Sequence, residues 1–187
     1  MDTAEGKKYT VQDILNLPEG QRAELIDGRW YDMSAPSFGH QMIVSIITRE
    51  LGNYIKEHGG DCVVLPAPFA VYLQDDDENY LEPDISVICD RDKISDRGCE
   101  GAPDLVIEVV SPSTKEKDYS DKLYKYRASG VKEYWIIDEK AGEVIIYFFS
   151  DDKSESKEVV AHIQSIDSPL VSRLYPEFSL ILTEYLK

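Results

Sequence analysis

A strand–helix–strand pattern between residues 104 and 138 constrains the fold of this chain more than any other feature. Residues 104–110 form an apolar run that ends at Ser-Pro-Ser-Thr, and residues 118–129 then show helical spacing until Gly130. A second apolar run follows at residues 133–138. Two strands joined through a helix in this way usually pair in parallel, with a right-handed crossover. The pattern therefore predicts an α/β domain built around two parallel strands.

Further elements are expected on both sides of this unit. Residues 40–58 carry apolar side chains at spacings of three and four, which predicts a helix. Residues 23–33 read as a β-hairpin with its turn at Asp27-Gly28, and residues 10–17 as a short helix capped by Thr10. Additional strands are expected at residues 62–65, 69–73, 83–89, 143–149 and 159–163. This order predicts a mixed β-sheet flanked by helices, with an N-terminal β-hairpin.

Length and hydropathy favour one domain that covers residues 1–187. The sequence has no apolar run of the length that a membrane span requires, and we expect no membrane partner. Residues 1–8 are polar and lack the apolar stretch of a secretory signal. The simplest expectation is a cytoplasmic protein.

The chain is strongly acidic, with a formal net charge of -16. Such a charge argues against tight non-specific binding of nucleic acid through a broad basic face. It leaves room for a local basic strip, and residues 115–132 carry six lysines and arginines against three acidic residues. That strip fits either phosphate contacts or a solvated helix face.

The three cysteines match no zinc-binding spacing. Cys62 and Cys89 lie in or beside apolar runs, so we expect them to be small buried hydrophobic side chains. Cys99 lies in a polar stretch, where an exposed side chain is expected.

Two carboxylates in apolar surroundings are the strongest candidates for a functional site. Asp84 opens the apolar run at residues 83–88, and Glu108 lies inside the run at residues 104–110. Burying a carboxylate costs several kcal/mol unless its charge is compensated. If the two strands are neighbours, both side chains can lie on one face, and Lys122 can fold back over them from the following helix.

This trio suits metal-assisted hydrolysis of a phosphodiester. Mg²⁺ prefers oxygen ligands and keeps several waters, so two carboxylates are sufficient protein ligands. The metal can activate water, and a lysine can orient that water or stabilise the charged phosphoryl group. Taken singly, Asp84 also fits a turn, and Lys122 fits a solvated ion pair with Asp118 worth about 0.3–0.5 kcal/mol. A glycosidase acid–base pair is a weaker alternative because it leaves the lysine without a role.

Several segments together resemble one known family. They are Glu82-Pro83-Asp84-Ile85-Ser86-Val87, the run at residues 103–114, the spacing of Asp118, Lys122 and Tyr126 before the run at residues 130–138, and the N-terminal residues 24–28 with His40-Gln41. They are similar to the Uma-type "putative restriction endonuclease" family of the PD-(D/E)xK nuclease superfamily, over about residues 10–183.

The resemblance implies a restriction-endonuclease-like core that binds Mg²⁺, with Mn²⁺ as a possible substitute, and cleaves DNA as a homodimer. Asp84 and Glu108 match the acidic motif residues that bind the metal. Val110 stands where the superfamily's lysine is usual, and Lys122 matches a lysine moved to the next helix. Glu24 matches a glutamate that would be a further acidic member of the catalytic site.

Two further features, His40 and the acidic surface, bear on the function. His40, at the start of a helix, fits a capping or packing role better than a catalytic one. The acidic surface also favours an alternative function, a non-catalytic binding or assembly module that retains the nuclease fold.

Overall fold

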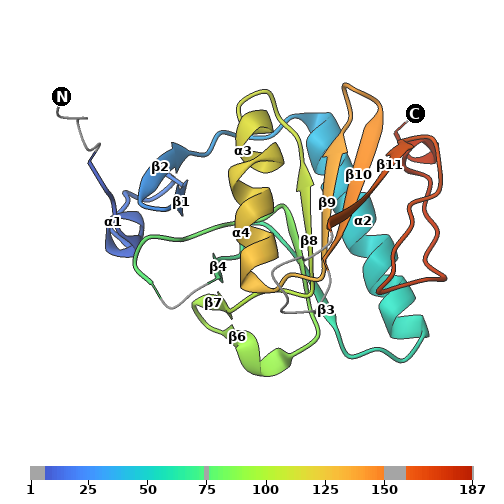
Figure 1. The fold of residues 1–187 in the computed structure, drawn as a ribbon, viewed down its shortest axis with the longest axis horizontal. Coiled ribbons are helices and arrows are strands. Elements are labelled where there is room, and N and C mark those ends of the chain that lie inside the picture. The colour runs from blue at the N-terminus through green and yellow to red at the C-terminus, as the bar shows by residue number, and fades with distance from the viewer. Residues whose placement is uncertain (1–6, 74–75, 150–158, 187) are drawn as a thin grey trace.

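A six-stranded mixed sheet lies at the centre of the protein (Figure 1). The structure is a computed structural model that describes residues 7–73, 76–149 and 159–186. The sheet has the strand order β11-β10-β9-β8-β5-β3. The bounds are β3 (Val63–Pro66), β5 (Ile85–Ile88), β8 (Leu105–Val109), β9 (Glu133–Asp138), β10 (Glu143–Phe149) and β11 (Val159–Ser165). The predicted mixed sheet flanked by helices is confirmed.

The predicted crossover is present between β8 and β9, which pair in parallel, whereas all other neighbours in this sheet are antiparallel. Its helical part consists of two pieces, α3 (Lys115–Tyr119) and α4 (Asp121–Ser129). Ser120 separates them with backbone angles of φ -125° and ψ -78°. The sequence predicted a single helix at residues 118–129, because no glycine or proline marks this break. Gly130 ends α4 in the left-handed conformation, as expected.

Helices cover the sheet from opposite sides, as Figure 1 shows for α2 and the α3–α4 pair. The 20-residue helix α2 (Phe38–Glu57) packs its apolar side against strand residues that include Ile85 and Ile107. On the other face Tyr126 of α4 packs against Val106 and Tyr134. Because side chains alternate along a strand, odd- and even-numbered positions of β8 enter two different cores.

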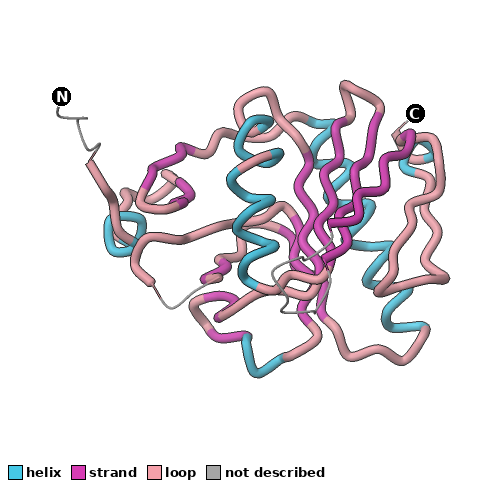
Figure 2. Tube along the Cα trace, in the orientation of Figure 1, coloured by secondary structure: helices cyan, strands magenta, loops and turns pink. Residues whose placement is uncertain are grey.

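The N-terminal region forms a separate layer of short elements beside α3 and α4 (Figures 1 and 2). Helix α1 (Val11–Leu15) has the expected capping box of Thr10 and Asp13, and β1 (Ala23–Ile26) pairs with β2 (Arg29–Asp32). The turn residues Asp27 and Gly28 both have positive φ, 52° and 73°, as a type I′ hairpin requires. In a small second sheet, β4 (Val71–Tyr72) lies within the strand expected at residues 69–73. Its partners β6 (Ile94–Ser95) and β7 (Gly98–Glu100), with the 3₁₀ turn η1 (Arg91–Lys93) before β6, were not expected because they are too short to show a pattern.

The C-terminal segment has little regular structure beyond the 3₁₀ turn η2 (Leu182–Glu184). The buried carboxylate of Glu133 holds it against β9. This carboxylate accepts hydrogen bonds from the backbone N–H groups of Arg173 (2.6 Å) and Leu174 (2.8 Å) and from Ser172 Oγ (3.0 Å). A buried acid thus replaces the hydrogen-bond ladder that a helix or strand would provide.

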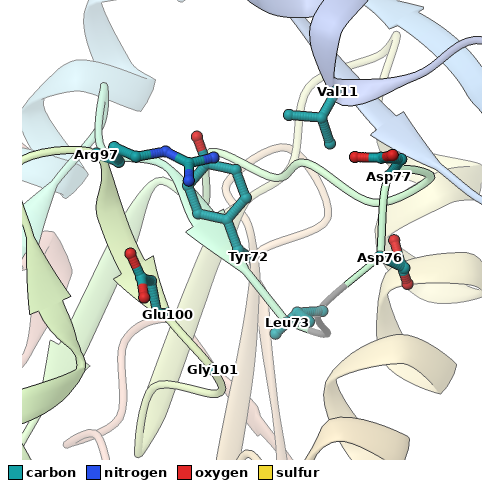
Figure 3. A pocket seen from close by; sticks show the side chains of 8 residues that line it. All are labelled: Val11, Tyr72, Leu73, Asp76, Asp77, Arg97, Glu100 and Gly101. Carbon is teal, nitrogen blue, oxygen red and sulfur yellow. The ribbon is translucent and has the colours of Figure 1, made fainter.

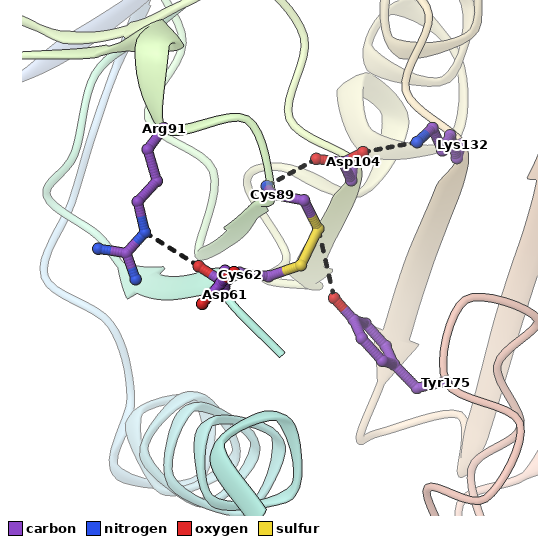
Figure 4. Close-up of a disulfide and its surroundings, with 7 residues drawn as sticks. All are labelled: Asp61, Cys62, Cys89, Arg91, Asp104, Lys132 and Tyr175. Atoms are coloured by element: carbon purple, nitrogen blue, oxygen red, sulfur yellow. Dashed lines mark hydrogen bonds and ion pairs between the residues drawn. A yellow bond between two sulfur atoms is a disulfide. The ribbon is translucent and has the colours of Figure 1, made fainter. Parts of the chain in front are cut away.

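The expectations for all three cysteines were wrong. Cys62 and Cys89 form a disulfide (Figure 4). The pairing of Val63 with Ile88 across β3 and β5 places these cysteines opposite one another at the next position of the register. Cys99 is fully buried in β7 rather than exposed. Both outcomes depend on the pairing of strands that are far apart in the sequence, and the spacing of the cysteines along the chain does not reveal this pairing.

Within the described parts of the chain, no helix combines the length and the apolar composition needed to cross a membrane.

The disulfide is expected to contribute measurably to stability. Its cysteines are 27 positions apart, and a cross-link over a loop of this size restricts the unfolded chain by about 3 kcal/mol. Reduction should therefore lower the denaturant midpoint of the wild type. A Cys62→Ala variant provides the control, because its midpoint should already be low and should not respond to reductant. Equal midpoints for oxidised and reduced wild type would contradict this prediction.

A second stability prediction concerns Asp104, which joins β8 to its neighbours. It accepts hydrogen bonds from Cys89 N and Lys132 Nζ, both at 2.8 Å (Figure 4). Partial burial opposes the charged form, but these two donors lower the pKa of Asp104 below its usual value. A lowered pKa means that its stabilisation is complete above the ordinary aspartate pKa and is lost as pH falls through the folded-state value.

Asp104→Asn should accordingly destabilise the protein by about 1 kcal/mol at pH 7, since the partly exposed ion pair is lost. Urea unfolding at several pH values tests this. The difference between wild type and variant should stay constant down to about pH 4.5 and shrink below the ordinary aspartate pKa of about 3.9. A difference that is independent of pH would assign the effect to packing instead.

Candidate active site

The candidate site is assembled around Glu108 on β8. Its Oε1 atom accepts hydrogen bonds from Lys122 Nζ (2.7 Å) and from the Tyr126 hydroxyl (2.8 Å). Lys122 and Tyr126 are four residues apart on α4 and therefore lie on one face of that helix. The structure thus brings Glu108 and Lys122 together, with the lysine reaching back from the helix that follows β8.

Glu24 joins the same cluster from the N-terminal hairpin. Its Oε1 atom lies 2.9 Å from Lys122 Nζ and accepts a hydrogen bond from Glu82 N (3.1 Å). Its Oε2 atom is paired with the ammonium group of Lys117 on α3. Glu24 therefore links β1 to both α3 and α4 through two buried lysines.

The cluster is closed to solvent and has a well-defined electrostatic pattern. Lys122 is 2% exposed, and Asp118 Oδ1 lies 3.7 Å from its ammonium group. Burial alone would lower the pKa of Lys122, but the carboxylates of Glu108, Glu24 and Asp118 together raise it well above its usual value. Lys122 is consequently an ammonium ion throughout the ordinary pH range and serves as a hydrogen-bond donor, never as a base, in this arrangement.

The two glutamates of the cluster respond in opposite directions. Burial raises the pKa of Glu108 to about 8, opposed by Lys122 and reinforced by the negative charges of Asp118, Asp84 and Glu24. Burial also acts on Glu24, but Lys122 and Lys117 outweigh it and lower the pKa of Glu24. The surrounding positive charge is therefore insufficient to compensate a negative charge on Glu108, whereas Lys122 and Lys117 fully compensate the charge of Glu24.

Asp84 reaches Glu108 through the strand register. Ile85 of β5 pairs with Ile107 of β8, and continuing this antiparallel register by one residue sets Asp84 opposite Glu108. Directly opposed residues project to the same face of a sheet. Asp84 Oδ2 also accepts a hydrogen bond from Val109 N (2.7 Å), which ties it to the residue after Glu108. Among the described contacts, Asp84 has none with Lys122, but the negative charge of Asp84 contributes to the raised pKa of Glu108.

His40 is closer to the site than its position at a helix start suggested. Its Nε2 atom lies 3.2 Å from Asp84 Oδ2, while its backbone N–H is capped by Ser37 Oγ. Burial opposes the charged imidazole, but the hydrogen bond and negative charge of Asp84 raise the pKa of His40 above its ordinary value. His40, in the first turn of α2, thus contacts a candidate metal ligand.

The donor atoms fit a hard divalent cation such as Mg²⁺. The described polar contacts of Glu108 use Oε1 and those of Asp84 use Oδ2. Those contacts leave Glu108 Oε2 and Asp84 Oδ1, two carboxylate oxygens on opposed residues, for a ligand. Over the described ranges, no group of three or more histidine, cysteine or acidic side chains is arranged to hold a metal. Water or substrate oxygens would therefore complete the coordination, as is usual for Mg²⁺.

The sequence pattern included Tyr126 in the spacing of Asp118 and Lys122 without assigning it a role, and it pointed neither to Lys117 nor to the contact of His40 with Asp84. Tyr126 had a usable signal, since it lies one helical turn after Lys122. No sequence signal points to Lys117, because its approach to Glu24 depends on the break at Ser120 and on the placement of the hairpin.

The charge cluster does not coincide with the open cavity that Figure 3 shows. That cavity, of about 650 Å³, lies beside β4 and β7, where Arg97 stacks on the Tyr72 ring at 5.0 Å. It shares no lining residue with the Glu108 cluster; its lining consists of Val11, Tyr72, Leu73, Asp76, Asp77, Arg97, Glu100 and Gly101. The candidate site is thus identified by its chemistry and not by cavity size.

Comparisons with known proteins agree with this architecture. A crystal structure of a "putative nuclease belonging to DUF820" from Anabaena variabilis superposes with a TM-score of 0.71, at 19% identity, covering 94% of this chain and 96% of that one. At this identity the likeness concerns the fold. A Synechocystis protein described as "Uncharacterized protein slr1290" is 31% identical over 149 residues, which are 78% of this chain and 76% of the relative.

A family model gives the assignment. The model of the Uma2 family, described as "Putative restriction endonuclease", matches residues 11–182. This range contains Glu24, Asp84, Glu108 and Lys122 and spans nearly the whole chain. The protein therefore belongs to the Uma2 family of "putative restriction endonucleases".

Proposed function

We propose that the protein is a metal-dependent endonuclease that hydrolyses phosphodiester bonds of DNA. The observation that carries the proposal is the closeness of three charged groups: Asp84 accepts a hydrogen bond from the residue after Glu108, its charge raises the pKa of Glu108, and the Lys122 ammonium lies 2.7 Å from Glu108. Membership of a family of "putative restriction endonucleases" supports a nuclease. The metal, the DNA substrate and the role of each residue are the proposed part.

Asp84 and Glu108 would hold Mg²⁺, with Mn²⁺ as a substitute. When bound, the ion would supply a Lewis acid that lowers the pKa of a water molecule and neutralises charge on the phosphate. The protein contributes two carboxylates whose relative position is fixed by the sheet. Asp84 is further held by Val109 N and His40, so its orientation does not depend on the ligand.

Lys122 would donate a hydrogen bond to the attacking water or to a phosphoryl oxygen. It cannot act as the base, because three carboxylates keep it protonated. A fixed positive charge in a low-dielectric site stabilises negative charge developing on the phosphate, and one such donor is typically worth 10²- to 10³-fold in rate, or about 3–4 kcal/mol. Glu24 would assist by holding Lys122 from the side of the hairpin.

One observation favours the alternative, a binding or assembly module without catalysis. The Lys122 side chain is only 3% exposed and is enclosed by carboxylates. Substrate could reach this group only if the cluster opened, and the net charge of -16 repels a polyanion. Metal binding and DNA cleavage separate the two functions.

The first functional prediction concerns the carboxylates. Asp84→Asn and Glu108→Gln should each reduce Mg²⁺- or Mn²⁺-dependent DNA cleavage at least 100-fold, because each removes a charged metal ligand while preserving shape. Nicking and linearisation of plasmid DNA provide the measurement. Asp104→Asn is the matched control: it also replaces an aspartate by asparagine, at the residue immediately before β8, and it should retain cleavage.

Two outcomes would count against catalysis. Wild-type protein that binds no Mn²⁺ at millimolar concentration by calorimetry, although folded, would favour the non-catalytic module. Cleavage that persists in both carboxylate variants would exclude these residues as the active site.

The second functional prediction concerns Tyr126, which we propose as a positioning residue for Glu108. The buried Tyr126 hydroxyl and the Lys122 ammonium both donate hydrogen bonds to Glu108 Oε1, which fixes the orientation of the carboxylate. Groups that orient a metal ligand typically affect metal affinity 10- to 100-fold when removed. Tyr126→Phe should weaken Mn²⁺ binding about tenfold in a calorimetric titration.

Tyr119→Phe serves as the control for this change, because no described hydrogen bond involves the Tyr119 hydroxyl and the ring lies near Lys115 instead. Its Mn²⁺ affinity should equal that of the wild type. If Tyr126→Phe binds Mn²⁺ as tightly as the wild type, Tyr126 does not position Glu108. Asp84 and Glu108 would remain the proposed metal ligands in that case.

A further inference from the structure

Strand β11 forms one edge of the central sheet, as the strand order and Figure 1 show. In the described part of the chain, its neighbour in the sheet is β10 alone. Its seven residues, Val-Val-Ala-His-Ile-Gln-Ser, include no aspartate, glutamate, lysine, arginine or proline. Charged residues and proline are the usual means by which edge strands avoid pairing with other chains.

The opposite edge of the same sheet differs. Strand β3 is only four residues long and ends at Pro66, which has no N–H to offer another strand. The disulfide from Cys62 also fastens this edge to β5. One edge of the sheet is therefore protected against strand addition, whereas β11 is not.

The backbone of β11 has groups available for pairing. The hydrogen bond from Ile166 N to Gly142 O fixes the alternation, so Val160, His162 and Gln164 point their N–H and C=O groups toward β10. The groups of Ala161 and Ile163 consequently point away from the sheet. No described backbone hydrogen bond outside the β10–β11 ladder uses either residue.

The side chains beside this edge are apolar. Ile163 is 63% exposed, and it lies on the same face as Ala161, which pairs with Tyr147 of β10. The Tyr147 ring stacks on that of Phe149 at 6.4 Å between centroids, and both residues are only half-buried. An apolar strip thus runs beside an open strand edge, on a protein in which 30% of residues are charged.

We propose that β11 is the interface with a second copy of this chain, formed by antiparallel pairing of the two β11 strands. A second copy fits this strand because the pairing of two β11 strands brings no aspartate, glutamate, lysine or arginine of either strand together. Each copy carries a net charge of -16, so contact between copies is least opposed at an uncharged surface of this kind. Nucleic acid does not fit, because β11 offers its backbone no lysine or arginine.

The strand is compatible with two-fold symmetry. With the axis at His162, Ala161 of one copy lies opposite Ile163 of the other, and the outward N–H and C=O groups of these residues become hydrogen-bonded. The same patch then meets itself, which is the isologous arrangement of most homodimers. The half-buried Tyr147 and Phe149 extend the contact beyond the strand pair, toward the roughly 800 Å² per partner of a stable interface.

Two variants test the interface in the full-length chain. Ala161→Pro removes an outward N–H and leaves the β10 ladder intact, because proline is tolerated on the free side of an edge strand. Ile163→Lys places a charge at the apolar strip. Leu15→Lys, which makes the same change at a 53% exposed leucine of α1, is the matched control.

Sedimentation velocity over about 1–100 μM protein should show a dimer for wild type and Leu15→Lys. Ala161→Pro and Ile163→Lys should raise the dimer dissociation constant at least tenfold, which is about 1.4 kcal/mol. Circular dichroism verifies that each variant is folded, and the two variants act independently, so loss of folding in one leaves the other as the test.

A wild type that is monomeric throughout this range would overturn the proposal, whatever other protein might pair with β11. So would a dimer that is unchanged in a folded variant of either kind. Neither measurement uses DNA or metal, so its result is independent of the proposed nuclease function.

Discussion

The buried ammonium group of Lys122 is the interaction on which the arrangement of the candidate site depends. It contacts Glu108 of the central sheet and Glu24 of the N-terminal hairpin, and lies 3.7 Å from Asp118 of the crossover helices. Removing one partner of a buried ion pair leaves an uncompensated charge and typically costs about 3–5 kcal/mol. The same contacts that set the electrostatics of the site therefore hold three separate parts of the fold together.

Charge attaches the hairpin to the helices, in addition to the apolar packing of Ile26 and Tyr31 against Tyr126. Glu24 and Asp27 of the hairpin pair with Lys117, Lys122 and Lys125, and Tyr31 donates a hydrogen bond to Asp121 (3.1 Å). The acidic side belongs to the hairpin and the basic side to α3 and α4. This explains the locally basic strip at residues 115–132: several of its lysines neutralise acids of the same chain, so the strip is not simply a free phosphate-binding surface.

Features that depend on residues close in sequence could be predicted, whereas features that depend on long-range contacts could not. The β8–β9 crossover, the Asp27-Gly28 hairpin and the capping box of Thr10 were predictable, because each is encoded by residues close in sequence. The disulfide and the buried Cys99 were not, since both follow from strands that pair over long separations. In the candidate site, Asp84, Glu108, Lys122 and Glu24 were selected by motif, whereas the contacts of Lys117 and His40 required the three-dimensional placement of α3 and α2.

Strand register connects the hydrophobic core to the chemistry. A shift of β5 by one residue would turn Asp84 to the opposite face and move it away from Glu108. The same shift would take Ile85 and Val87 out of the core that they form with α2 and turn Asp84 and Ser86 into that core in their place. Burying a carboxylate among apolar side chains without a compensating charge costs several kcal/mol, so the core strongly disfavours the shifted register. The relative position of the two carboxylates is therefore maintained in part by apolar side chains on the far face of the sheet.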